Sequence, residues 1–166
     1  MAIIDGLLFT FTFMGVLGCG LMAGLFFAFS VSVMKALARL PSDAGMAAMQ
    51  SINVAIINPV FLAAFFGTAA ACLLLIIVAL WRWREPGAVY WLIGGALYLV
   101  GTFWVTVAFN VPKNKALAAV APTDPSGTRL WTDYLSKWTA WNHVRAAAAL
   151  AAAAALTIAL CHGAAH

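Results

Sequence analysis

Four long apolar runs, separated by short polar stretches, dominate the pattern of hydrophobic and polar positions along the chain. They cover about residues 6–34, 59–81, 89–109 and 138–160. A helix needs about 20 apolar residues to cross a hydrocarbon core of roughly 30 Å, and each run is long enough. The pattern therefore predicts an all-α integral membrane protein, in which a four-helix bundle forms a single transmembrane domain over residues 1–166.

Prolines and polar turn residues indicate where these helices begin and bend. The segment Pro41-Ser42-Asp43 is typical of a helix start, so we expect the second helix to begin near Ala44. Continued to the end of the second run, this helix would measure roughly 55 Å, which exceeds one bilayer crossing. Pro59 is expected to kink it by removing a backbone hydrogen bond. The third run meets Pro112, and an amphipathic segment after Pro125 leads into the fourth.

The composition agrees with a membrane location and excludes other classes of protein. Apolar residues make up 65% of the chain and charged residues 8%, whereas a soluble domain carries roughly 25% charged residues. A soluble fold and a nucleic-acid partner are therefore excluded, in spite of the net charge of +4. Cys19, Cys72 and Cys161 lie far apart in apolar runs and form no disulfide framework. We expect contacts with membrane lipid and leave open whether the chain forms a homo-oligomer.

The basic residues of the loops predict the orientation of the chain. Seven lie in or near the first and third loops and two in the second: Lys35, Arg39, Lys113, Lys115, Arg129, Lys137 and Arg145 against Arg82 and Arg84. Cytoplasmic loops carry an excess of basic residues. We therefore expect loops one and three in the cytoplasm, both termini outside, and a bacterial inner membrane as the location.

Two stretches of the chain align as an internal repeat. Residues 28–31 (Ala-Phe-Ser-Val) match residues 108–111 (Ala-Phe-Asn-Val), and both precede a Lys-Ala-Leu-Ala segment. The alignment predicts a duplicated two-helix unit whose parallel repeats are related by an axis along the membrane normal. It places four polar side chains at a similar depth near the cytoplasmic face: Ser30, Asn53, Asn110 and Asn142. They form either a ligand site or interhelical contacts worth about 0.6 kcal/mol each.

The fourth run carries the most informative group of side chains. Trp138, Trp141, Asn142 and Arg145 fall within about 100° of one another on a helix. An ionisable residue inside a membrane segment indicates a functional site. The alternative interpretation is an arginine that extends to the interface beside an aromatic belt. The spacing alone does not separate these interpretations.

Further amides lie on the other helices. The second helix contributes Gln50, Asn53 and Asn58, and the third Asn110 and Asn114. Asn58 alternatively satisfies a carbonyl that Pro59 leaves unpaired. No apolar run contains a carboxylate, and no histidine pair has helical spacing, so we expect neither a metal site nor a cofactor. His143 is the nearest candidate general base, but the helical angle points it away from the candidate face.

Together these residues resemble the anthrone oxygenase-like family of small four-span membrane proteins. The resemblance covers nearly the whole chain. It rests on Phe29-Ser30 with Met34, Met49-Gln50 with Asn53, Asn58-Pro59 with Phe61, Asn110-Val-Pro-Lys-Asn114, and Trp138, Trp141, Asn142 and Arg145. Fungal members oxidise an anthrone to an anthraquinone with O₂ and no evident cofactor, whereas most bacterial members have no assigned substrate.

The resemblance implies a membrane-embedded oxygenase that acts on a lipophilic anthrone, phenol or quinone-like molecule. Trp138 and Trp141 would then stack on the substrate, with Ser30, Gln50, Asn58 and Asn114 as further binding residues. Arg145, Asn142, Asn110 and Asn53 would stabilise its oxyanion. The second hypothesis is a non-enzymatic membrane protein that binds a small lipophilic ligand or serves as an assembly or transport subunit.

Overall fold

The chain folds into helices joined by short turns. The computed structural model describes residues 2–163, and this part of the chain is helical with no strand. The first and third spans are each built from several helical pieces, of which η1, η2 and η3 are π-helical, and a separate helix, α3, precedes the second. The elements are α1 (Ala2–Ala28), η1 (Phe29–Val33), α2 (Met34–Leu37), α3 (Ser42–Ala55), α4 (Pro59–Trp81), α5 (Ala88–Ala96), η2 (Leu97–Trp104), η3 (Thr106–Asn110), α6 (Val111–Ala118) and α7 (Gly127–Gly163).

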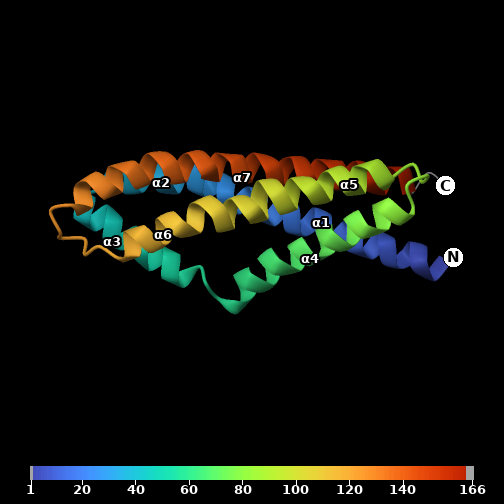
Figure 1. The fold of residues 1–166 in the computed structure, drawn as a ribbon, viewed down its shortest axis with the longest axis horizontal. Coiled ribbons are helices and arrows are strands. Elements are labelled where there is room, and N and C mark those ends of the chain that lie inside the picture. The colour runs from blue at the N-terminus through green and yellow to red at the C-terminus, as the bar shows by residue number, and fades with distance from the viewer. Residues whose placement is uncertain (1, 164–166) are drawn as a thin grey trace.

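Four helical stretches among the described residues are long and apolar enough to cross a membrane, which confirms the predicted all-α fold with four spans. They cover Asp5–Leu37, Pro59–Trp81, Ala88–Ala118 and Gly127–His162. The two ends of the chain lie at the same end of the bundle, and α2, α3, α6 and the start of α7 gather at the other (Figure 1). The 37 residues of α7 extend over roughly 55 Å at 1.5 Å per residue. The bundle is therefore longer than the hydrocarbon core.

The second span is broken rather than kinked. The α3 helix ends at Ala55, and α4 begins at Pro59 with the proline in its first turn, where its missing N–H costs nothing. The Asn58 side chain caps the new helix by accepting a bond from the Phe61 N–H at 3.0 Å, and its amide donates to the Ala55 carbonyl at 3.0 Å. In Figure 1 this junction stands away from the other helices.

The third span continues further than its apolar run predicts. It remains helical through Pro112 to Ala118, because the proline lies in the first turn of α6 directly after η3. A π-helical turn carries an extra residue and loosens the local hydrogen-bond ladder, so the ring fits without ending the helix. Asn110 and Asn114 thus lie on one continuous helix, although both follow the predicted end of the third run at residue 109.

Close helix contacts explain the alanine-rich sequence of α7. Cβ atoms added at two glycines of the third span would clash with it: at Gly101, 2.4 Å from Ala148 Cβ, and at Gly94, 2.8 Å from Leu156. The small residues let the backbones approach. In contrast, Gly20 and Gly24, which have the GxxxG spacing of close helix pairs in membranes, have nothing within 4 Å of an added Cβ. They do not mediate packing within this chain, and the homo-oligomer stays a prediction.

The bundle has two hydrophobic cores. The larger surrounds Cys19, Cys72 and Tyr98 in the middle of the spans. The smaller lies at the end opposite the chain termini and consists of Met34, Leu37, Met46, Met49, Leu117, Trp131, Tyr134 and Trp138. Within it, Tyr134 stacks between Trp131 and Trp138, with ring centres 5.7 and 5.8 Å away. The stack of Trp131, Tyr134 and Trp138 fixes the position of the Trp138 ring.

The two halves of the predicted repeat share features but make different contacts. Both aligned stretches contain π-helical residues, and Ser30 and Asn110 are both buried. Asn142 donates to Ser30 Oγ at 2.7 Å, whereas Asn53 donates to the Tyr134 hydroxyl. The helix that carries Asn53 ends at Ala55, and a new helix begins at Pro59. The duplication stays a prediction.

Candidate functional site

An apolar cavity of about 250 Å³ lies beside the break in the second span. It opens between the α3–α4 junction and the π-helical part of the third span, and the fourth span forms its base. Six of its lining residues are aromatic, and most of the others are aliphatic: the aromatic ones are Phe26, Phe29, Phe61, Phe65, Phe66 and Trp138. Its polar lining residues are Asn53, Thr106, Asn114 and Arg145. A small-molecule site is typically an apolar cavity with a small number of polar groups.

Arg145 points between the helices and not toward the surface, which contradicts the alternative interpretation of an arginine at the interface. The residue is 5% exposed. Its Nη2 donates to Asn142 Oδ1 at 2.5 Å and its Nη1 to Thr106 Oγ1 at 3.2 Å, while its Nε has no partner in the described part of the chain. The guanidinium carbon also lies 4.2 Å from the centre of the Phe26 ring and 5.1 Å from that of Trp138.

This guanidinium has no carboxylate beside it. No salt bridge joins Arg145 to an acid among residues 2–163, and no acid lines the cavity. Two amide or hydroxyl oxygens and two aromatic rings stabilise the cation instead, the rings by roughly 2 kcal/mol each when desolvated. Because neutral partners do not cancel the charge, its field remains available to an anion that enters the cavity.

Asn142 fixes the position of the guanidinium. Its Oδ1 accepts the bond from Arg145, and its Nδ2 donates to the Phe26 carbonyl at 2.6 Å and to Ser30 Oγ at 2.7 Å. All of its polar atoms are thus used, and the residue is fully buried. The carbonyl of Phe26 lies one turn before η1, where a π-helical turn begins. Asn142 and Ser30 therefore hold the guanidinium in position, and neither residue lines the cavity.

A second polar group lies toward the loop end of the cavity. The Tyr134 hydroxyl donates to Asn114 Oδ1 at 2.9 Å and receives a longer contact from Asn53 Nδ2 at 3.5 Å. Tyr134 itself is buried in the smaller core. It thus joins an amide of the second span to an amide of the third, and both amides line the cavity.

The two tryptophans of the candidate face have different surroundings. Trp138 lines the cavity, and its Nε1 has no partner within the described chain. Trp141 lies outside the cavity and stacks on Phe109, with ring centres 3.7 Å apart. Asn110 is also outside: its Nδ2 donates to the Trp138 carbonyl at 3.2 Å, and its buried Oδ1 is unpartnered in the described residues. Of these three predicted site residues, only Trp138 lines the cavity.

Two other predicted binding residues have structural contacts. Gln50 donates to the carbonyls of Leu117 and Val120 at 2.8 and 3.0 Å, at the end of α6. Asn58 caps α4. Neither residue lines the cavity. His143 is exposed on α7, consistent with the predicted direction away from the site.

Sequence reasoning missed Tyr134 as part of the site. Its helix position relative to Trp138 and Trp141 (four and seven residues earlier) is a signal for the same face. The predicted span begins at residue 138, and Tyr134 lies in the amphipathic segment before it. The sequence places Thr106 on the same helix face as Asn110 and Asn114, but a threonine in a membrane helix usually bonds its own backbone, and Thr106 is not among the candidate binding residues. Its hydroxyl does bond its own helix, donating to the Thr102 carbonyl at 2.7 Å.

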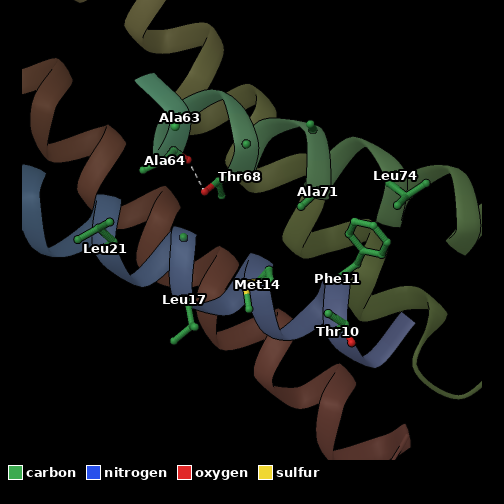
Figure 2. A pocket seen from close by; sticks show the side chains of 13 residues that line it. Thr10, Phe11, Met14, Leu17, Leu21, Ala63, Ala64, Thr68, Ala71 and Leu74 are labelled. Atoms are coloured by element: carbon green, nitrogen blue, oxygen red, sulfur yellow. Dashed lines mark hydrogen bonds between the residues drawn. The ribbon is translucent and has the colours of Figure 1, made fainter. Parts of the chain in front are cut away.

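A larger hollow between α1 and α4 lacks unsatisfied polar groups (Figure 2). It is lined mostly by apolar side chains, including Phe11, Met14 and Leu17. Its two threonines bond their own helices: Thr10 donates to the Gly6 carbonyl at 2.9 Å, and Thr68 to the Ala64 carbonyl at 2.7 Å. This hollow therefore offers a ligand apolar contact alone.

A third hollow lies at the end of the bundle that holds the chain termini. It is lined by Asp5, Arg82 and Glu85. Arg82 contacts Asp5 at 3.1 Å and also pairs with Glu85. Because two carboxylates neutralise it, this arginine differs from Arg145, which has none. The cavity at Arg145 is thus the strongest candidate site.

Comparison with known proteins identifies a family whose model matches this chain. The model of the anthrone oxygenase family matches residues 60–155, more than half of the chain. The matched region includes Thr106, Asn114, Trp138 and Arg145 of the site, while Asn53 lies before it. Comparisons with curated proteins and with solved structures gave no match. The chain belongs to the anthrone oxygenase family.

Proposed function

We propose that this protein is a membrane-embedded oxygenase that oxidises a lipophilic aromatic molecule with O₂ and needs no obligatory cofactor. One observation carries the proposal: the guanidinium of Arg145 lies buried at an aromatic cavity without a carboxylate partner. Such a cation is costly to place inside a membrane helix, by about 2.5–3.5 kcal/mol. The cost is explained if the charge binds an anionic substrate.

The reaction uses the acidity of an anthrone. Loss of one proton from its methylene group gives a delocalised anion, whose oxygen would bind at Arg145. The electron-rich carbon then reacts with O₂ to form a hydroperoxide, and loss of water leaves a second carbonyl. One anthrone and one O₂ thus give one anthraquinone and one water. The carbon is oxidised, and O₂ is reduced to the new carbonyl oxygen and the water.

The residues of the chain would act on the first step. The cation of Arg145 favours the deprotonated form of an acid bound beside it. Phe26 and Trp138 flank the guanidinium and would pack against the rings of the substrate. The described lining of the cavity holds no carboxylate or imidazole, so water at the cavity mouth would accept the proton. Turnover should therefore rise with pH.

The test uses the full chain reconstituted in lipid nanodiscs, with anthrone as substrate and an oxygen electrode as readout. We expect O₂ uptake above the uncatalysed rate and one anthraquinone for each O₂. Arg145→Lys keeps a charge but loses the planar group of donors, so kcat/KM should fall by about 10²–10³, as when one oxyanion donor is removed. Thr157→Val, on the exposed side of α7, serves as control. Equal uptake by the wild type and empty nanodiscs would refute the proposal.

One observation favours the second hypothesis, a protein that binds a lipophilic ligand without transforming it. The cavity lining lacks a side chain suited to general-base catalysis, and His143 is exposed elsewhere on α7. The same preparation separates the hypotheses. A binder would quench tryptophan fluorescence on addition of anthraquinone in an Arg145-dependent manner, yet show no O₂ uptake with anthrone.

A further inference from the structure

The cavity has a polar group at each end, and we propose that it selects flat aromatic ligands with two different oxygen functions. An acceptor oxygen would bind at Arg145, and a hydroxyl would bind between Asn53 and Asn114. This inference rests on the proposed function, because it concerns the ligand of the same cavity. It assigns Asn53 and Asn114 as specificity-determining residues and Tyr134 as the residue that positions them.

The end at Arg145 offers chiefly donors. The guanidinium has no acceptor atoms, its Nε is unpartnered in the described chain, and Thr106 already uses its hydrogen to bond the Thr102 carbonyl. A carbonyl oxygen or an oxyanion satisfies such donors, whereas a hydroxyl proton would find as acceptor only the second lone pair of Thr106 Oγ1, whose first accepts from Arg145.

The other end offers one donor and one acceptor. The Tyr134 hydroxyl uses Asn114 Oδ1 and Asn53 Nδ2, which leaves Asn114 Nδ2 and Asn53 Oδ1 for a ligand. If the Tyr134 hydroxyl turned to donate to Asn53, the remaining groups would again be one donor and one acceptor. A hydroxyl group both donates and accepts, so it satisfies the pair. A methoxy group cannot donate and would leave a carbonyl oxygen unpaired.

The distance between the two ends fits a fused ring system. Thr106 and Asn114 are eight residues apart on the third span, which corresponds to roughly 12 Å along a helix axis. The wall between them is apolar and includes Phe29, Ile52 and Val111. The volume of about 250 Å³ is at the lower limit of ligand cavities, which are typically about 300–1,000 Å³. A flat molecule of two or three fused rings satisfies both conditions.

The test compares equilibrium binding of stable products, so it does not depend on turnover. The probes are anthraquinones with either a hydroxyl or a methoxy group on an outer ring, at the position most distant from the carbonyls. Binding to nanodisc-embedded protein is followed by tryptophan fluorescence in mildly acidic buffer, where the hydroxyl keeps its proton. We expect the hydroxyl probe to bind at least about tenfold more tightly, the ratio that one satisfied hydrogen bond gives.

Three variants identify the groups responsible. Asn53→Leu and Asn114→Leu should each bring the ratio of the two dissociation constants close to one, with little change in affinity for the methoxy probe. Tyr134→Phe keeps the aromatic stack but frees both amides, so the ratio should fall while methoxy binding stays. Thr157→Val should keep the wild-type ratio. Thr157 lies away from the cavity, and its hydroxyl donates to the Ala153 carbonyl.

The outcomes are distinguishable from those of the oxygenase experiment. Equal affinity of the wild type for both probes, or a ratio retained in both asparagine variants, would overturn the assignment of this end of the cavity even if anthrone is oxidised. A strong hydroxyl preference that depends on Asn53 and Asn114, without O₂ uptake, would support the two-ended cavity and contradict the oxygenase.

Discussion

The bond between Asn142 and Arg145 leads to a quantitative prediction about stability. Asn142→Leu removes one hydrogen bond to a cation and two bonds to neutral groups, the Phe26 carbonyl and Ser30 Oγ. A bond to a charged group contributes about 1.5–3 kcal/mol and a neutral one about 0.5–1.5 kcal/mol. We therefore expect the free energy of unfolding to fall by roughly 3–6 kcal/mol.

A second substitution isolates the charged contact. Arg145→Met removes the cation while keeping an unbranched apolar side chain, so Asn142 then has no charge to hold. In the double variant Asn142→Leu/Arg145→Met, the buried cation that lost its acceptor is gone. The double variant should be less destabilised than the two single changes together, by about 1.5–3 kcal/mol.

The assay is equilibrium unfolding of detergent-solubilised protein, followed by circular dichroism of the four variants in the cycle. Thr157→Val, which removes an exposed hydroxyl of the same helix, is the reference for an unspecific change. Additive effects, with a coupling below about 0.5 kcal/mol, would refute the inference that Asn142 stabilises the guanidinium. Arg145→Met should also abolish turnover. Turnover reports the role of the charge in catalysis, and the free energy of unfolding reports its role in folding.

Three further predictions concern the bundle. Asn58→Ala removes the cap of α4 and should lower the free energy of unfolding by about 1 kcal/mol, measured in the same unfolding assay; an unchanged value would contradict the capping role. Gly18→Ala would place a Cβ 2.0 Å from a threonine hydroxyl of α4 and should cost about 1–3 kcal/mol, whereas Gly20→Ala faces open space and should stabilise α1 by up to about 1 kcal/mol; equal effects would contradict this packing. A cysteine at Ser126 should react with a cytoplasmic labelling reagent and one at Gly87 should not, and the reverse pattern would invert the predicted topology.

The number and order of the spans were predictable because each apolar run exceeds the length that a bilayer requires. Their limits were less predictable. Hydropathy does not detect the first three turns of α7, where Trp131 and Tyr134 are buried in an amphipathic helix. The kink expected at Pro59 is a complete break because Asn58 supplies the cap of a new helix. A proline alone does not distinguish these outcomes.

The site was predictable where one helix determined it. Three of the four residues grouped on the fourth span, Trp138, Asn142 and Arg145, are buried together. Trp141 lies at the margin of that face, and only the position of Phe109 on the third span decides where its ring packs. Which of the predicted amides line the cavity depends on how the four helices pack together. Asn53 and Asn114 line the cavity, while Gln50 bonds carbonyls of α6, and no single-helix spacing separates the two cases.

The π-helical segments have a consequence for how this bundle tolerates changes in chain length. Each π-helical turn holds one residue more than the α-helical turn that it replaces. Deleting one residue within Phe29–Val33 would let that turn close as an α-helix, and the residues on either side would keep their faces. The same deletion in α7, which is α-helical throughout, would rotate everything after it by about 100°. Single-residue deletions should therefore be tolerated within the π-helical segments of the first and third spans and should disrupt the packing of the fourth.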